Sequence, residues 1–109
     1  MGYLGEFEQL ILYSVILLED DAYGVAIREA IEKRTGRVVS SGAIYTALGR
    51  LEERGLVRSS VGESGSGPGR PRKYYRIRPE GARALKESYD AINAMAGGLM
   101  PKLADLAEG

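Results

Sequence analysis

The sequence predicts a mainly α-helical fold of the α+β class with one small β-hairpin. Three segments before Gly55 carry apolar residues at helical spacing. Two short runs typical of strands follow, and a loop dominated by glycine, serine and proline joins them. A further helical pattern starts at Pro79, a residue that suits the first turn of a helix. We expect a chain of 109 residues to form one modest hydrophobic core.

The first helix is expected at residues 6–18, buried on more than one side. Its apolar run is shorter than the roughly 20 residues of a membrane span, and the N-terminus lacks the features of a secretory signal. We therefore expect a cytoplasmic protein with no membrane partner. The stripe at helical spacing comprises Phe7, Leu10, Ile11, Ser14, Leu17 and Leu18, and the other apolar positions are Leu4, Leu12, Val15 and Ile16.

The second helix is expected from Tyr23 to Thr35, with Gly36 as its stop. Asp20 or Asp21 can supply its N-terminal cap. The residues expected to point inward are Val25, Ile27, Ala30 and Ile31.

The third helix is expected between a capping serine at Ser40 and Gly55, which closes it in the left-handed conformation. Its inner stripe comprises Ile44, Ala47, Leu48 and Leu51. The opposite face carries Gly42, Thr46, Gly49 and Glu53, with Tyr45 and Arg50 on the two flanks. That face is small, polar and free of bulky aliphatic side chains.

The hairpin is expected from strands at residues 56–61 and 73–77, joined by the loop 62–71. Arg70 and Arg72 stand beside prolines in or next to this loop, and nothing in its composition requires them for packing. Tyr74 and Tyr75 alternate on the second strand, so one faces inward, and core packing is their favoured role.

The last helical segment carries an apolar heptad seam that predicts a dimer. Together with the apolar first helix it offers more apolar face than one small core can use. Gly97, Gly98 and Pro101 predict a kink or a break within the segment. We expect residues 1–78 to form one domain and 79–109 a dimerisation helix. The residues assigned to the dimer contact are Phe7, Ile11, Leu85, Tyr89, Ile92, Leu99, Leu103 and Leu106.

The chain contains no Cys, His or Trp, which removes several chemistries. Without Cys or His there is no disulfide, thiolate nucleophile, Ser-His relay or Cys/His zinc site. The acidic residues show no catalytic or metal-binding motif. We therefore expect neither enzymatic activity nor a cofactor or metal.

The charges are balanced in number but separated along the chain. The sequence has 15 basic and 15 acidic residues. Residues 1–27 carry five acids and no base, whereas residues 58–78 carry six bases and one acid. A local basic patch matters more for phosphate binding than net charge does.

Three helices, a hairpin and a further helix match the order of a winged helix-turn-helix, which binds double-stranded DNA. In such domains the third helix enters the major groove and the hairpin, or wing, lies along the backbone. Candidate base-reading residues are Ser41, Tyr45, Thr46 and Arg50. Candidate phosphate-binding residues are Arg70, Arg72 and Lys73. Tyr45 has a second interpretation, packing across the helix-turn-helix as a half-buried aromatic.

The sequence resembles the PadR family of transcriptional regulators over roughly residues 7–85. The resemblance implies a dimeric repressor with Tyr45 on its recognition helix, basic residues on its wing and a last helix that pairs with the partner subunit. Two departures stand out: Ala22 replaces a histidine found in many relatives, and the last helix lacks the tryptophan of drug-binding members. The matching motifs are Tyr23-Gly24, Gly42-Ala43-Ile44-Tyr45 with Leu48, residues 51–57, residues 69–76, and Gly81 with Leu85.

Two functions remain open from the sequence. The first is a repressor that binds an inverted-repeat operator as a homodimer. The second is a winged-helix module that docks on a protein, which the basic wing and the polar third helix disfavour. An unidentified small-molecule effector is a further expectation. The space for it is predicted between the paired helices, beside Ala94, Met95, Ala96 and Met100.

Overall fold

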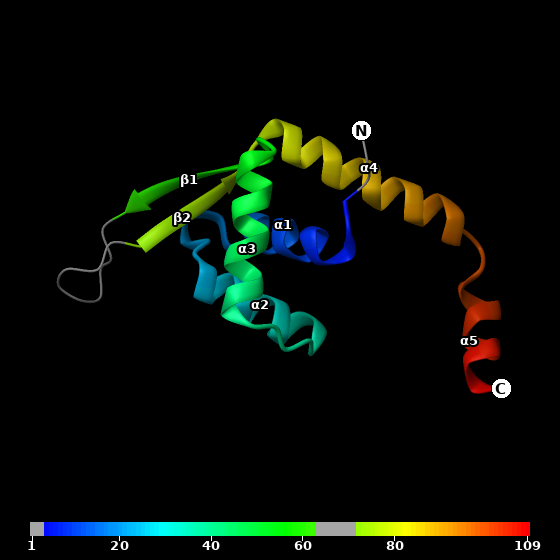
Figure 1. Ribbon diagram of the computed structural model, residues 1–109. Coiled ribbons are helices and arrows are strands. Elements are labelled where there is room, and N and C mark those ends of the chain that lie inside the picture. The colour runs from blue at the N-terminus through cyan, green and yellow to red at the C-terminus, as the bar shows by residue number, and fades with distance from the viewer. Residues whose placement is uncertain (1–3, 63–71) are drawn as a thin grey trace.

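The computed structural model describes residues 4–62 and 72–109 and contains a helical body with a two-stranded antiparallel hairpin (Figure 1). The expected mainly α fold with a winged helix-turn-helix is confirmed. The hairpin extends to one side, and α5 stands apart from the body at the other (Figure 1). In chain order the elements are α1 (Glu6–Leu18), a 3-10 turn η1 (Glu19–Asp21), α2 (Gly24–Thr35), α3 (Ser41–Glu53), β1 (Val57–Gly62), β2 (Arg72–Ile77), α4 (Pro79–Ala96) and α5 (Met100–Glu108).

The ends of α2 and α3 follow local chemistry with one exception. The Ser40 hydroxyl accepts a hydrogen bond from the Ala43 amide at 3.1 Å, which caps α3. Gly36 and Gly55 both adopt the left-handed conformation, with φ of 76° and 75°. The cap expected from Asp20 or Asp21 is wrong, because both residues belong to η1 and the N-cap of α2 is Tyr23 without a side-chain hydrogen bond.

The core lies where α1 meets α2, α3, β2 and α4. The expected inner stripe of α3 is confirmed, because all four of its residues are buried. One other expectation about burial is wrong, because Val25 of α2 is 41% exposed. In α1, Leu12 and Val15 are buried, as expected for a helix buried on more than one side. One side of α1, carrying Tyr13, Ile16 and Leu17, is left uncovered in the single chain.

The hairpin is tied to the segment that precedes α2. Ser59 pairs with Tyr75 in the antiparallel register. The Tyr75 amide donates to the carbonyl of Ala22 at 2.8 Å, and Tyr23 forms an isolated bridge with Tyr74. Tyr75 is buried, as expected for a core residue, and Tyr74 is half-buried. The wing therefore has a fixed base against the body.

The kink or break expected in the last helical segment is a break into two helices. Gly97 ends α4, Gly98 adopts φ of 77°, and Pro101 lies in the first turn of α5. The middle of α4 is anchored to the body through a buried hydrogen bond of 3.0 Å from the Leu4 amide to the Ser88 hydroxyl. In the described parts of the chain, no helix has the length and apolar character needed to cross a membrane.

Candidate nucleic-acid interface

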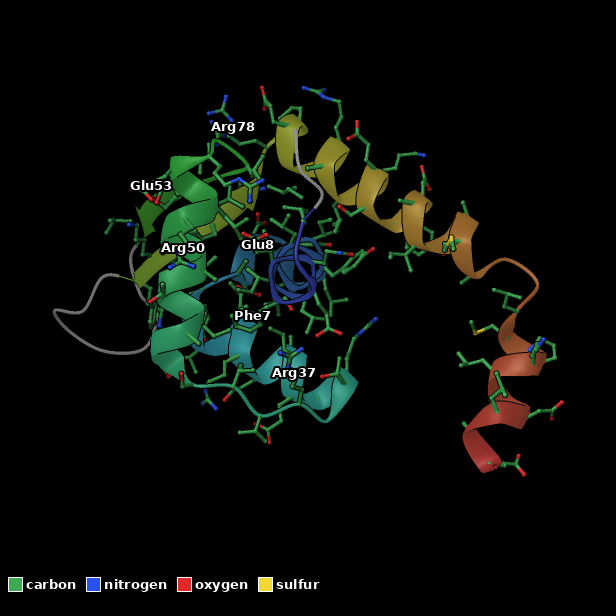
Figure 2. The ribbon with its side chains drawn as sticks, turned by 45° about the vertical axis from the view of Figure 1, so that its right-hand side comes forward. Phe7, Glu8, Arg37, Arg50, Glu53 and Arg78 are labelled. Atoms are coloured by element: carbon green, nitrogen blue, oxygen red, sulfur yellow. The ribbon has the colours of Figure 1, made fainter. Side chains whose placement is uncertain are left out.

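The outer face of α3 is exposed along its whole length. Gly42, Thr46, Gly49 and Glu53 are all exposed there, as expected from their spacing. Figure 2 shows Arg50 and Glu53 on this helix. Arg50 forms no ion pair with any residue that the structure describes, and its exposed guanidinium carries five donors. Ser41 is also exposed, in the first turn of the helix.

Tyr45 is half-exposed and also packs across the helix-turn-helix. Its side chain is 50% exposed on the flank of α3. The end of its ring lies against Gly24, where a β-carbon would come within 2.5 Å of both the Cζ and Oη atoms. The ring therefore packs across the helix-turn-helix and still offers half of its surface to a partner.

The three wing cations are placed differently from one another. Arg70 lies outside the residues that the structure describes. The guanidinium carbon of Arg72 lies 4.2 Å from the centroid of the Tyr23 ring, a cation–π contact. Lys73 has its Nζ 3.7 Å from a carboxylate oxygen of Glu52 and 5.9 Å from the Tyr75 ring. The sequence did not predict the contacts with Tyr23 and Glu52, because each joins residues that are distant along the chain.

Glu52 connects α3 to both strands of the wing. The Ser59 hydroxyl on β1 donates to its carboxylate at 2.6 Å, and Lys73 on β2 pairs with the other oxygen. The Ser59 hydrogen bond and, to a smaller extent, Lys73 lower the pKa of Glu52, against partial burial that raises it. Burial, with the nearby Glu52 and Tyr45, raises the pKa of Tyr75. The wing and the recognition helix thus share one polar network.

Folding brings some of the separated charges back together. Arg76 forms an ion pair with Asp20 of η1, and Arg78 lies 3.6 Å from Glu80. Arg58, which was not singled out as a contact, is exposed on β1 and has no ion pair among the described residues. Its place in the basic segment 58–78 was the signal that could have identified it. The basic surface is therefore smaller than the sequence suggests.

The residues expected at the dimer contact divide into three groups. Ile11 and Leu85 are wrong as contact residues, because both are buried in the core of the single chain. Phe7 is half-buried, with the Arg37 guanidinium 5.7 Å from its ring centroid; both are labelled in Figure 2. The remaining five are more than half exposed: Tyr89, Ile92, Leu99, Leu103 and Leu106.

The end of α4 and the face of α5 form one apolar groove of about 500 Å³. Met95, Ala96 and Met100, three of the residues named for an effector space, line it together with the exposed seam from Ile92 to Leu106. A volume of this size is within the range of small-molecule sites. Binding of an effector there stays a prediction.

This arrangement of a polar third helix, a wing and a trailing helix is matched by known regulators. Residues 11–87 match the Transcriptional regulator PadR-like family. The chain belongs to the PadR-like family. It is a transcriptional regulator of that family, in agreement with the motifs that include Tyr23-Gly24.

The PadR-like assignment is supported by three relatives. The transcriptional regulator Rv3488 of Mycobacterium tuberculosis is 35% identical over 78 residues, covering 72% of this chain and 69% of that protein. A PadR family transcription regulator from Clostridium difficile has a TM-score of 0.74 at 25% identity, covering 91% of this chain and 99% of its own. A PadR-like transcriptional regulator from Bacillus cereus has a TM-score of 0.69 at 30% identity, with 94% and 92% covered.

Proposed function

We propose that this PadR-like protein is a homodimeric repressor that binds an inverted-repeat operator in double-stranded DNA. The exposed polar face of α3 carries the proposal. It has no bulky aliphatic side chain, and its Arg50 has no ion pair among the described residues. An α-helix fits the major groove, which is roughly 12 Å wide, and polar side chains on its outer face reach base edges. A protein-docking face would be richer in aromatic and aliphatic residues.

The DNA contacts are divided between α3 and the wing. Tyr45, Thr46 and Arg50 approach bases, with Ser41 at the beginning of the helix. Arg70, Arg72 and Lys73 bind backbone phosphates and orient the protein on the duplex. Lys73 is shared between Glu52 and a phosphate, so its share of the attraction is smaller than that of a free lysine.

The dimer forms through the apolar surface that the single chain leaves uncovered. Tyr13, Ile16 and Leu17 on α1 are 42% to 47% exposed in the described part of the chain, and the seam of α4 and α5 is more than half exposed. Burying each such leucine stabilises the assembly by roughly 1.5 to 3 kcal/mol. Residues 1–78 act as the DNA-binding domain, and residues 79–109 hold the dimer. A two-fold pair presents two recognition helices to half-sites about 34 Å apart.

A gel-shift titration with the upstream region of the protein's own gene tests this function. The expected result is a saturable complex that survives excess random DNA and contains two chains per operator. Equal affinity for operator and random DNA would refute sequence-specific binding. Complete absence of DNA binding would favour the protein-docking alternative.

A further inference from the structure

Gly24 provides the surface on which the recognition tyrosine rests. It is the first residue of α2, and it is buried under the end of the Tyr45 ring. Its φ is not in the left-handed range, so alanine is compatible with the backbone there. A β-carbon at this position would nevertheless lie 2.5 Å from the Tyr45 Cζ atom. The clash would fall on the movable end of a half-exposed side chain and would displace the ring from α2.

Tyr23, the residue before it, holds the wing in a similar way. Its ring lies under the Arg72 guanidinium at 4.2 Å and meets the Tyr74 ring edge-on at 5.7 Å between centroids. The isolated bridge to Tyr74 keeps the backbones of these two residues together. A planar guanidinium held on an aromatic face populates fewer rotamers in the free protein. Its side chain therefore loses less conformational entropy when a complex forms.

We infer that Tyr23 and Gly24 are positioning residues. These two neighbours fix the orientation of DNA-contacting side chains on α3 and on the wing. Gly24 sets the direction of Tyr45 on the recognition helix, and Tyr23 sets Arg72 on the wing. This inference rests on the proposed DNA-binding function. It assigns base preference to Gly24 and general DNA affinity to Tyr23, although neither is placed among the contacts themselves.

The Gly24→Ala variant tests the first half through a double-mutant cycle with Tyr45→Ala. Gly24→Ala is expected to keep the helical circular dichroism and melting temperature, and to lose at least about fivefold in operator affinity, the lower end for one base contact. In the Tyr45→Ala background it should change affinity by less than about twofold, because the two act as one unit. An equal loss in both backgrounds, or no loss from Tyr45→Ala itself, would overturn the assignment to Gly24.

The second half is tested with Tyr23→Leu and Tyr23→Phe. Removing the aromatic face is expected to weaken operator and random DNA alike by about two- to tenfold, the cost of ordering one long side chain. The phenylalanine variant keeps the face and should bind like the original protein. Tyr23→Leu should have no further effect in the Arg72→Ala background. A loss that persists there would mean that Tyr23 acts through the fold alone.

A measurement without DNA separates this inference from the proposed function. With 3-fluorotyrosine placed at position 45, Gly24→Ala should shift the fluorine NMR signal, and the control Gly5→Ala, whose β-carbon would find only an ordinary contact of 3.7 Å, should not. An unchanged signal in Gly24→Ala overturns the positioning role whatever the protein binds. A shifted signal in a protein that shows no preference for the operator refutes the proposed function and leaves the contact standing.

Discussion

Glu52 links α3 to both strands of the wing through contacts with Ser59 and Lys73. Its position on α3 and that of Lys73 on β2 are 21 residues apart in the sequence, and the Ser59 hydroxyl that binds it comes from a third element. The stripe of buried residues on α3 depends only on helical periodicity and was predicted correctly. The partners of Lys73 and Arg72 depend on how the hairpin docks, which periodicity does not specify.

The lowered pKa of Glu52 predicts a pH-dependent contribution to stability. Because the folded pKa lies below the unfolded value, the contribution is present above about pH 4.3 and is lost as pH falls through the folded pKa. Denaturation with urea should therefore show Glu52→Gln to be less stable than the original protein near pH 6, with the difference shrinking at pH 3. Ser59→Ala should raise the pKa of Glu52, measured by NMR of its carboxyl carbon. A stability difference independent of pH would contradict the role of the charged form.

Arg50 is the side chain on which base preference is expected to depend most. Replacing it by alanine should reduce the preference for operator over random DNA by about 1 to 3 kcal/mol per lost base contact. Competition gel shifts measure this ratio. Arg83→Ala is the matched control, because Arg83 is an exposed arginine on α4 at 4.0 Å from Glu80. The two variants behaving alike would remove Arg50 from the base-reading set.

The positions of the helices and strands were predicted more completely than the faces that they bury. The three helices before the hairpin, the two strands and the break at Gly97 and Gly98 all follow from local patterns and turn residues. The error concerns a face: Val25 is exposed although its spacing placed it inside. A helix with apolar residues on several sides has no unique inner face by periodicity, so the neighbouring elements decide.

The contact between α4 and the segment after α3 predicts a severe packing defect. A β-carbon at Gly81 would overlap the backbone carbonyl oxygen of Leu56 and lie 3.0 Å from Ile77 Cγ1. A backbone obstacle cannot rotate away, so Gly81→Ala should destabilise the fold by more than about 3 kcal/mol in urea denaturation. Gly42→Ala has open space and should be neutral or stabilise by up to about 1 kcal/mol. Equal stability of the two variants would mean that α4 is not in close contact with the backbone of Leu56.

The wing as a unit is expected to supply sequence-independent attraction. Replacing Arg70 and Arg72 by alanine should weaken operator and random DNA alike. It should also flatten the slope of log affinity against log salt by about 3 to 4 units if all four arginines of a dimer contact phosphate. Gel shifts over a series of salt concentrations give the slope. Full affinity and an unchanged slope would show that the wing is not an electrostatic clamp.

The extended shape of the molecule, 55 × 30 × 21 Å, reflects an arm that its own body does not cover. The heptad seam predicted that arm, but its first residue, Leu85, belongs to the core. The boundary expected at residue 78 stays a prediction. In the structure the first part of α4, up to Ser88, packs on the body through Leu85 and Ser88. Only the exposed part of the seam is available to a second copy.

A charge placed in the exposed seam should separate the dimer. Ile92, which is 67% exposed, can be replaced by glutamate with little effect on the core of the single chain. Light scattering at micromolar concentration should then show a monomer that keeps its helical circular dichroism. Val61→Glu is the control, since Val61 is equally exposed at 69% but lies on the wing. A stable monomer of the original protein, or a dimer of the Ile92→Glu variant, would contradict this interface.

The hydrogen bond between Leu4 and Ser88 also bears on the order in which the chain folds during its synthesis. It joins positions 84 residues apart, and Leu85 enters the same core one turn earlier on α4. The ribosome releases α3 and the wing before it releases these residues, so a nascent chain ending within the hairpin lacks part of the packing that fixes its recognition helix. We expect the DNA-binding surface to assemble only after α4 has been translated. If the proposed function holds, a growing chain would then not occupy DNA before it carries the helices proposed for the dimer contact.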